Sequence, residues 1–296
     1  MADSVMELNV IQLAKQSAFN TVQATSTYNW GGRGSMKFED AVIQPNYVTG
    51  EAGGLTVEDV FIADTGTMIS LADVPVSPTM LTWVGCMAIK DLSASNTTYA
   101  FATPTSTVNT LAPFTFKLAT LHQPYMAQDC FIEEFNLHGD VSSNNGQVQF
   151  NAKVGGRLAV VNTKTASLTL LPNHTASILN QNSCGVKLAT IGTTPPTVAQ
   201  TGLVQAISLN WKTGFTRGRY SDARTTKDYA VIDGGGLHYD ITGTIRIMFG
   251  TGTAGTDGLT HLANARAGTS KNMLVTYTAG NGDTAAFLLP IVYTDT

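Results

Sequence analysis

Two short stretches place a histidine two residues before an aspartate, a spacing that a metal site could use. They are His138-Gly139-Asp140 and His238-Tyr239-Asp240. Residues two apart leave the same face of an extended strand, so each imidazole and its carboxylate would point to one side. A zinc site needs further converging ligands, and the sequence identifies none. The favoured interpretation is a polar strand face in contact with water, and no metal or cofactor is expected.

A glycine-rich run, Gly250 to Gly255, matches the pattern G-x-G-x-x-G directly after a predicted strand. A dinucleotide site would need a helix that begins on the last glycines and a parallel strand beyond it. Here the predicted helix starts later, and the strands beyond it form a hairpin. A loop is therefore the favoured interpretation. Glu133 and Glu134 are adjacent and would leave opposite faces of a strand, which argues against a catalytic pair, and we expect no enzyme.

The stretch 212–236 mixes basic and aromatic residues between two predicted strands. Nucleic acid could bind such a mixture, but three aspartates dilute its charge, and a solvated excursion is a further interpretation. A loop this long is uncommon unless it binds something, and arginine and tyrosine are enriched at protein interfaces. We favour a docking loop between subunits, with these candidates: Lys212, Phe215, Arg217, Arg219, Tyr220, Arg224, Lys227 and Tyr229.

Composition limits the class of protein. Of 296 residues, 43% are hydrophobic and only 13% charged, about half of the typical ~25%. So little charge indicates a surface that is largely covered, and the net charge of −4 gives no global case for tight nucleic-acid or membrane binding. The three cysteines are widely spaced and odd in number, which favours reduced thiols. Without a signal peptide or an apolar run of ~20 residues, we expect a soluble protein made in the cytoplasm.

The clearest element is a strand over residues 147–154, in which apolar and polar residues alternate with period two. It follows an apolar strand, residues 131–137, and Asn145-Gly146 between them marks a reversal. The pattern recurs in residues 204–211 and 237–249, which suggests two copies of one module. The predicted wet faces are Gln147, Gln149, Asn151 and Lys153 in the first copy, and His238, Asp240, Thr242, Thr244 and Arg246 in the second.

These patterns predict an all-β chain of two tandem β-sandwich modules with one or two short helices and long loops. Residues 1–35 read as an N-terminal arm, 36–165 as the first module and 166–296 as the second. A linker of about 166–203, containing Pro195-Pro196, opens the second module. One helix is expected over 259–267, ended by Gly268, while residues 56–66 fit either a helix or strands. A final hairpin joins 273–278 to 285–293, with Pro290 at a sheet edge or at a bulge.

Three stretches resemble the tail tube (major tail) proteins of long, flexible-tailed, siphovirus-type bacteriophages. They are LAKQSAFNTVQATST near the start, CFIEEFNLHGDVSSNNGQVQFNAKVGGRL in the centre, and GGGLHYDITGTIRIMFG followed by the final hairpin. The resemblance covers most of the chain and lies in its patterns, without an invariant signature.

The resemblance implies a structural virion protein. Members of the family form rings whose inner sheets join in a β-barrel, and the rings stack into a tube that conducts DNA. Two modules per chain would build a pseudo-hexameric ring from three copies. The implied partners are the tape measure, tail tip and terminator proteins and passing DNA, which is not bound specifically; the implied location is the virion tail, after synthesis in the host cytoplasm.

The resemblance assigns the wet faces to the tube lumen, where a neutral or acidic wall would let DNA slide. Lys153 and Arg246 depart from that expectation, and an outward orientation stays open for both. Two alternatives also stay open: another β-sandwich virion component, such as a decoration or baseplate protein, and a carbohydrate-binding or hydrolytic β-protein. The last would need exposed tryptophans, and Trp30, Trp83 and Trp211 are scattered along the chain.

Overall fold

A computed structural model describes the chain over residues 6–8, 10–43, 61–89, 111–120, 123–165, 168–171, 178–191, 196–199, 204–218, 231–233, 240–248 and 258–292. Strands dominate this part of the chain, and its two α-helices are short. The all-β prediction is confirmed. None of the helices in the described ranges is long and apolar enough to cross a membrane.

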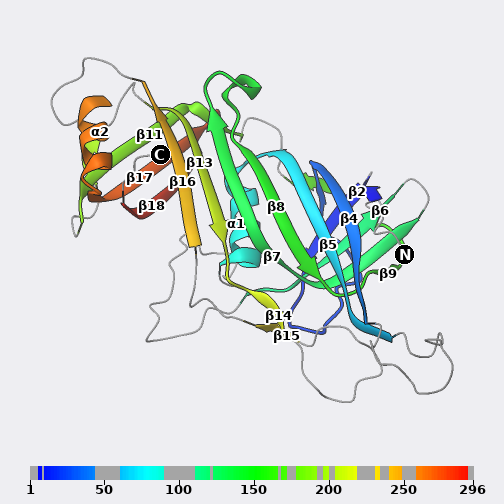
Figure 1. Ribbon diagram of the computed structural model, residues 1–296. Coiled ribbons are helices and arrows are strands. Elements are labelled where there is room, and N and C mark those ends of the chain that lie inside the picture. Colours follow the sequence, from blue (N-terminus) through cyan, green and yellow to red (C-terminus); the bar gives the residue numbers. More distant parts are fainter. Residues whose placement is uncertain are drawn as a thin grey trace, which may run out of the picture.

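The fold is organised around one long strand, β7 (Pro124–Asp140). Its C-terminal half pairs with β8 (Gln149–Gly156) on one side and with β13 (Val204–Lys212) on the other. Pairing continues outward from both, so that strands of both halves of the sequence form one antiparallel layer (Figure 1). We call it the front layer, and its order is β1 (Met6–Leu8), β4 (Arg33–Ile43), β5 (Phe61–Pro75), β8, β7, β13, β16 (Asp240–Ile247).

The N-terminal half of β7 belongs to a second, back layer. It pairs with β6, and the order continues to β2, β3 and β10, while β9 pairs with the opposite edge of β7. The strand can serve both layers because it is bulged: the register shifts between Ile132 and Glu134, and Asp129 has a φ of 53°. The bounds are β6 (Phe114–Ala119), β2 (Val10–Lys15), β3 (Tyr28–Trp30), β10 (Thr169–Leu171) and β9 (Val160–Val161).

Helix α1 (Pro78–Ala88) lies behind the front layer and packs against β7 (Figure 1). It begins where the Ser77 side chain accepts a hydrogen bond from the Met80 amide and where proline occupies the first turn. Its Met80, Val84 and Met87 are buried in the main core. The sequence-based interpretation expects strands here, although Ser77-Pro78 is a usual helix start.

The second half adds a four-stranded sheet, β12 (Val198–Ala199), β11 (Leu179–Thr190), β17 (Ser270–Ala279) and β18 (Thr284–Val292). Before β17 comes α2 (Gly258–Arg266), which ends near Gly268 at a φ of 60°, as predicted. The β17–β18 hairpin is also confirmed, and β18, which contains Pro290, has β17 as its one described partner. A small ribbon pairs β14 (Thr216–Gly218) with β15 (Val231–Asp233).

The structure bears on three further points of the sequence-based interpretation. The N-terminal arm is instead structural: β2 lies between β6 and β3, and its Ile11 and Leu13 are buried. The predicted linker contains β11, which pairs along its length with β17. Of the two alternatives left open for residues 56–66, the strand is found from residue 61 onward, where β5 begins. In each case long-range pairing, which local sequence patterns do not reveal, decides the structure.

Candidate functional site

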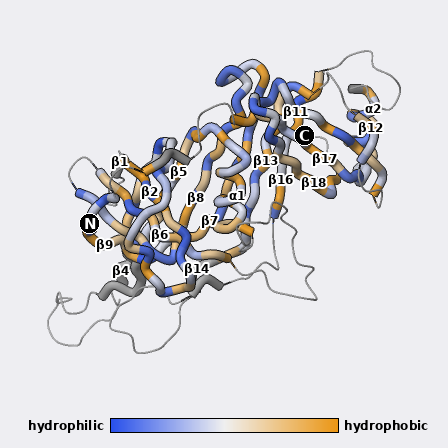
Figure 2. Tube along the Cα trace, turned by 180° about the vertical axis from the view of Figure 1, so that it is seen from behind, coloured by the Kyte–Doolittle hydropathy of each residue, from blue (hydrophilic) through white to orange (hydrophobic). Residues whose placement is uncertain are grey.

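The front layer has one dry and one wet side. The apolar side chains of β8, β7 and β13 point to the core, among them Phe150, Leu137 and Trp211. Figure 2 shows hydrophobic and hydrophilic positions alternating along these strands. We call the opposite side the polar wall, and its residues on four adjacent strands are Asn151 and Lys153; Glu133, Glu134, Asn136, His138 and Asp140; Ser208, Asn210 and Lys212; and Asp240, Thr242, Thr244 and Arg246.

Charge alternates from strand to strand in one row of the wall. In the register of the layer, Glu134 lies opposite Lys153 on one side and Lys212 on the other, and Lys212 lies opposite Asp240. Opposite charges that face each other across antiparallel strands stabilise the pairing by roughly 0.2–1 kcal/mol each. The sequence of each strand therefore helps to fix the register that builds the wall.

A second row consists of neutral amides. Asn136 lies between Asn151 and Asn210 in the register, and its side-chain amide donates to Ser208 Oγ at 3.0 Å. With the amide nitrogen used as a donor, the Asn136 oxygen accepts from His138 Nδ1, 3.1 Å away. This fixes the proton of neutral His138 on Nδ1 and leaves Nε2 as a hydrogen-bond acceptor.

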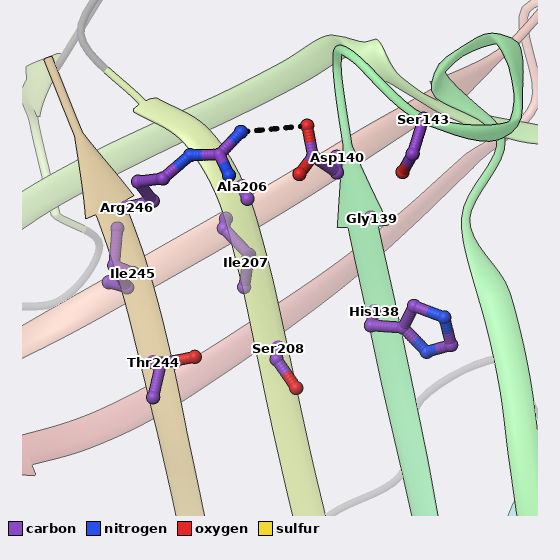
Figure 3. A pocket seen from close by; sticks show the side chains of 10 residues that line it. All are labelled: His138, Gly139, Asp140, Ser143, Ala206, Ile207, Ser208, Thr244, Ile245 and Arg246. Atoms are coloured by element: carbon purple, nitrogen blue, oxygen red, sulfur yellow. Dashed lines mark hydrogen bonds and ion pairs between the residues drawn. The ribbon is translucent and has the colours of Figure 1, made fainter.

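A shallow hollow of about 470 Å³ lies at the end of the wall beside the β7–β8 turn (Figure 3). At its rim, Arg246 Nη2 donates to Asp140 Oδ1 at 2.9 Å, reaching across the small residue Ala206. Asp140 also accepts from the amide and the hydroxyl of Ser142 at 2.8 and 2.7 Å. These bonds from Ser142, and then the charge of Arg246, lower the pKa of Asp140, which is therefore ionised at neutral pH.

A bulge brings two acids to the wall that the sequence pattern places on opposite faces. Glu133 is the extra residue between Ile132 and Glu134, and its backbone oxygen accepts from the Thr213 amide and hydroxyl. As a result, Glu133 Oε2 lies 3.6 Å from Lys153 Nζ, while Glu134 Oε1 accepts from Asn210 at 3.0 Å. The prediction that these acids point apart is wrong, since period-two counting fails across a bulge.

Most predicted lumen residues lie together on the wall, namely Asn151, Lys153, Asp240, Thr242, Thr244 and Arg246. Lys153 and Arg246 point to this side, each beside a carboxylate. Gln149 shares this face, but its exposed fraction is only 6%. Gln147 lies just before β8 and forms an isolated β-bridge with Asn180. His238 lies outside the described residues. The β7 side chains of the wall were missed, although the alternation in Glu134 to Asp140 is visible in the sequence.

The predicted docking loop is only partly described. Lys212 belongs to the wall, and Phe215 is wrong as a docking residue because it is 4% exposed and packs with Leu111 and Phe131. Arg217 lies in the β14 strand of the small ribbon. The remaining candidates lie outside the described residues: Arg219, Tyr220, Arg224, Lys227 and Tyr229.

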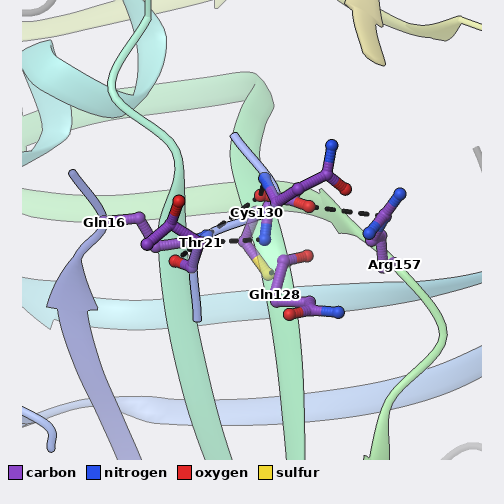
Figure 4. Close-up of polar contacts among 7 residues, drawn as sticks. Gln16, Thr21, Gln128, Cys130 and Arg157 are labelled. Atoms are coloured by element: carbon purple, nitrogen blue, oxygen red, sulfur yellow. Dashed lines mark hydrogen bonds and ion pairs between the residues drawn. The ribbon is translucent and has the colours of Figure 1, made fainter. Parts of the chain in front are cut away.

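A buried polar cluster lies where β7 passes from the front to the back layer (Figure 4). Asp129 is fully buried; its Oδ1 accepts from Gln16 Nε2 at 3.0 Å and from the Asn20 amide at 2.9 Å, and its own amide donates to Gln16 at 2.8 Å. Arg157 Nε is 3.3 Å from Oδ2. Burial raises the pKa of Asp129, although the bonds from Asn20 and Gln16 and the charge of Arg157 oppose it.

Other candidate chemistry is not assembled in the described part of the chain. Trp30 and Trp211 are buried, and Trp83 packs against Tyr28 and Phe114, so the tryptophans form no exposed sugar platform there. No three metal-ligating side chains of the described ranges converge. Scanning the chain against protein-family models finds no match, and neither does a search of curated proteins.

Proposed function

We propose that this chain is a structural virion protein that polymerises into stacked rings and forms the tube of a phage tail, through which DNA leaves. The observation that carries the proposal is the front layer. Strands from both halves of the sequence share one sheet, which is dry on one side and lined by the polar wall on the other.

The edges of the front layer support assembly between copies. Among the described strands, β1 pairs with β4 alone and β16 with β13 alone, so each end of the layer presents backbone groups to a neighbour. An open strand edge favours pairing with another chain, and closing several layers into a barrel removes such edges. In a ring, the polar wall would face the lumen and the back layer would face outward.

The wall is suited to a polyanion that passes without being held. Six of its fourteen residues are neutral amides or hydroxyls, and its three cations stand among four carboxylates. Affinity for nucleic acid comes chiefly from unpaired cations that contact phosphates, so a wall of this kind gives little retention. The proposed ring contains three copies, because each chain contributes strands from two halves.

Negative-stain electron microscopy of the purified protein at rising concentration, with its mass in solution measured alongside, tests the proposal. Rings or hollow tubes with a regular axial repeat are expected, and threefold symmetry would support three copies per ring. A chain that stays monomeric at every concentration, even when tail-tip complexes are added as seeds, would contradict the proposal. A glycan-binding screen would then test the carbohydrate-binding alternative.

A further inference from the structure

Each cation on β8, β13 and β16 of the polar wall has a carboxylate beside it. Lys153 is 3.6 Å from Glu133 and Arg246 is 2.9 Å from Asp140, although both cationic side chains are half exposed, at 51% and 52%. Lys212 lies between Glu134 and Asp240 in the register. A polyanion can therefore reach these cations, but it meets a carboxylate at every one of them.

Two small residues make room for the pairs. A Cβ on Gly155 would lie 2.4 Å from Glu133 Oε1, so the glycine allows the Glu133 side chain to lie over β8 beside Lys153. Ala206 stands between Asp140 and Arg246, and the guanidinium crosses above it (Figure 3). The pairing thus depends on residues of several strands, which distinguishes it from a chance meeting of flexible side chains.

We propose that Glu133 and Asp140 mask a nucleic-acid-binding surface, and that the wall binds duplex DNA when these two carboxylates are neutralised. That passing DNA is the natural ligand rests on the proposed function. The masking of the surface is a property of the single chain and can be tested on it. The physical reason is competition: a phosphate can contact Lys153 or Arg246 only by displacing a carboxylate and by approaching its negative charge. An amide of the same shape removes both obstacles.

The test compares the double variant Glu133→Gln/Asp140→Asn with the unaltered chain. Both substitutions keep the side-chain shape, and the amide oxygen that Asp140→Asn introduces can still accept from Ser142. Binding is measured by fluorescence anisotropy with a labelled duplex of about 20 base pairs at about 50 mM salt. The matched control is Asp283→Lys, in the exposed turn between β17 and β18, which changes the net charge by the same two units away from the wall.

The double variant is expected to bind DNA roughly tenfold more tightly than the unaltered chain, with about a twelvefold loss of affinity between 50 and 200 mM salt, as two phosphate contacts predict. The DNA affinity of Asp283→Lys should equal that of the unaltered chain. Adding Lys153→Gln and Arg246→Gln to the double variant should abolish its gain in affinity. The proposal would be overturned if Asp283→Lys bound DNA as tightly as the double variant. It would also be overturned if the double variant, with unchanged circular dichroism, showed no gain in DNA affinity. Tube formation is scored separately by microscopy, so failure of the proposed function would not be confused with failure of the masking.

Discussion

The buried carboxylate of Asp129 connects three segments that are far apart in the sequence: the end of β2, the middle of β7 and the residue after β8. Gln16 bonds both to its side chain and to its backbone amide, and Arg157 supplies the positive charge. A buried ion of this kind is costly unless its neighbours satisfy it. The cluster therefore determines how the N-terminal strands are held at the bend of β7.

Replacing Asp129 by Asn should destabilise the fold by about 1–3 kcal/mol at neutral pH. The amide oxygen can still accept from Gln16 and Asn20, but the amide nitrogen would face Arg157, a donor beside a donor. The free energy of unfolding is measured with urea. Glu134→Gln, which removes a partly buried carboxylate elsewhere on β7, is the control and should cost less than half as much.

The same variant should show a pH dependence. Burial raises the pKa of Asp129 in the folded state above its ordinary value of 3.8, so the folded chain binds this proton more tightly than the unfolded chain. The part of the stability that depends on this proton is then fully present below pH 3.8 and is lost as the pH rises through the folded-state pKa, whereas the hydrogen bonds from Gln16 and Asn20 remain above it. The stability advantage of the unaltered chain over Asp129→Asn should grow as the pH is lowered from 7 towards 4; an advantage that shrinks would contradict this assignment.

At the scale of elements, α1 depends on its first turn. The hydroxyl of Ser77 accepts from the Met80 amide at 3.2 Å inside the core, where water cannot replace it. Ser77→Ala should lower the free energy of unfolding by about 1 kcal/mol, measured by urea unfolding. Thr79→Ala, at an exposed position of the same turn, should change it by less than about 0.5 kcal/mol. Equal effects of the two substitutions would show that the cap contributes nothing.

The small ribbon allows a clean test of the docking loop. Gly218 and Val231 lie directly opposite each other, so a two-residue Asn-Gly turn can replace residues 219–230 and join the strands. The free energy of unfolding of the shortened chain should lie within about 0.5 kcal/mol of that of the full chain, because the loop is removed without breaking the ribbon. Ring stacking, scored by microscopy, should be lost. Tubes of unchanged length from the shortened chain would show that residues 219–230 are not needed for docking.

The elements that the sequence predicts well are those with an uninterrupted period of two. β8, β13, β16 and the β17–β18 hairpin follow their alternation, and Asn145-Gly146 marks the turn before β8 correctly. The alternation does not place Glu133 on the wall, because the bulge at this residue shifts the phase of β7. The back layer could not be predicted, because alternation shows which face of a strand is wet but not which strands pair.

At the scale of the whole molecule, the seam between the two halves is the pair β7–β13. Seven residue pairs cross it in register, and the rings of Phe135 and Trp211 stack across it with centroids 5.3 Å apart. Both side chains are buried in the same core as α1 and β17. The halves therefore share one core, which two independently folding modules would not do.

This shared core predicts a single cooperative unfolding transition. Tryptophan fluorescence, which reports on Trp30, Trp83 and Trp211, should follow the same urea curve as circular dichroism of the strands. Trp211→Ala should lower the free energy of unfolding by about 3–5 kcal/mol as reported by both probes, because it leaves a cavity between β7 and β13. Two separated transitions, with Trp211→Ala moving only one of them, would show that the front layer joins two modules that fold alone. One coincident transition would mean that the wall is a product of the entire chain, since neither half could hold its strands of the front layer without the other.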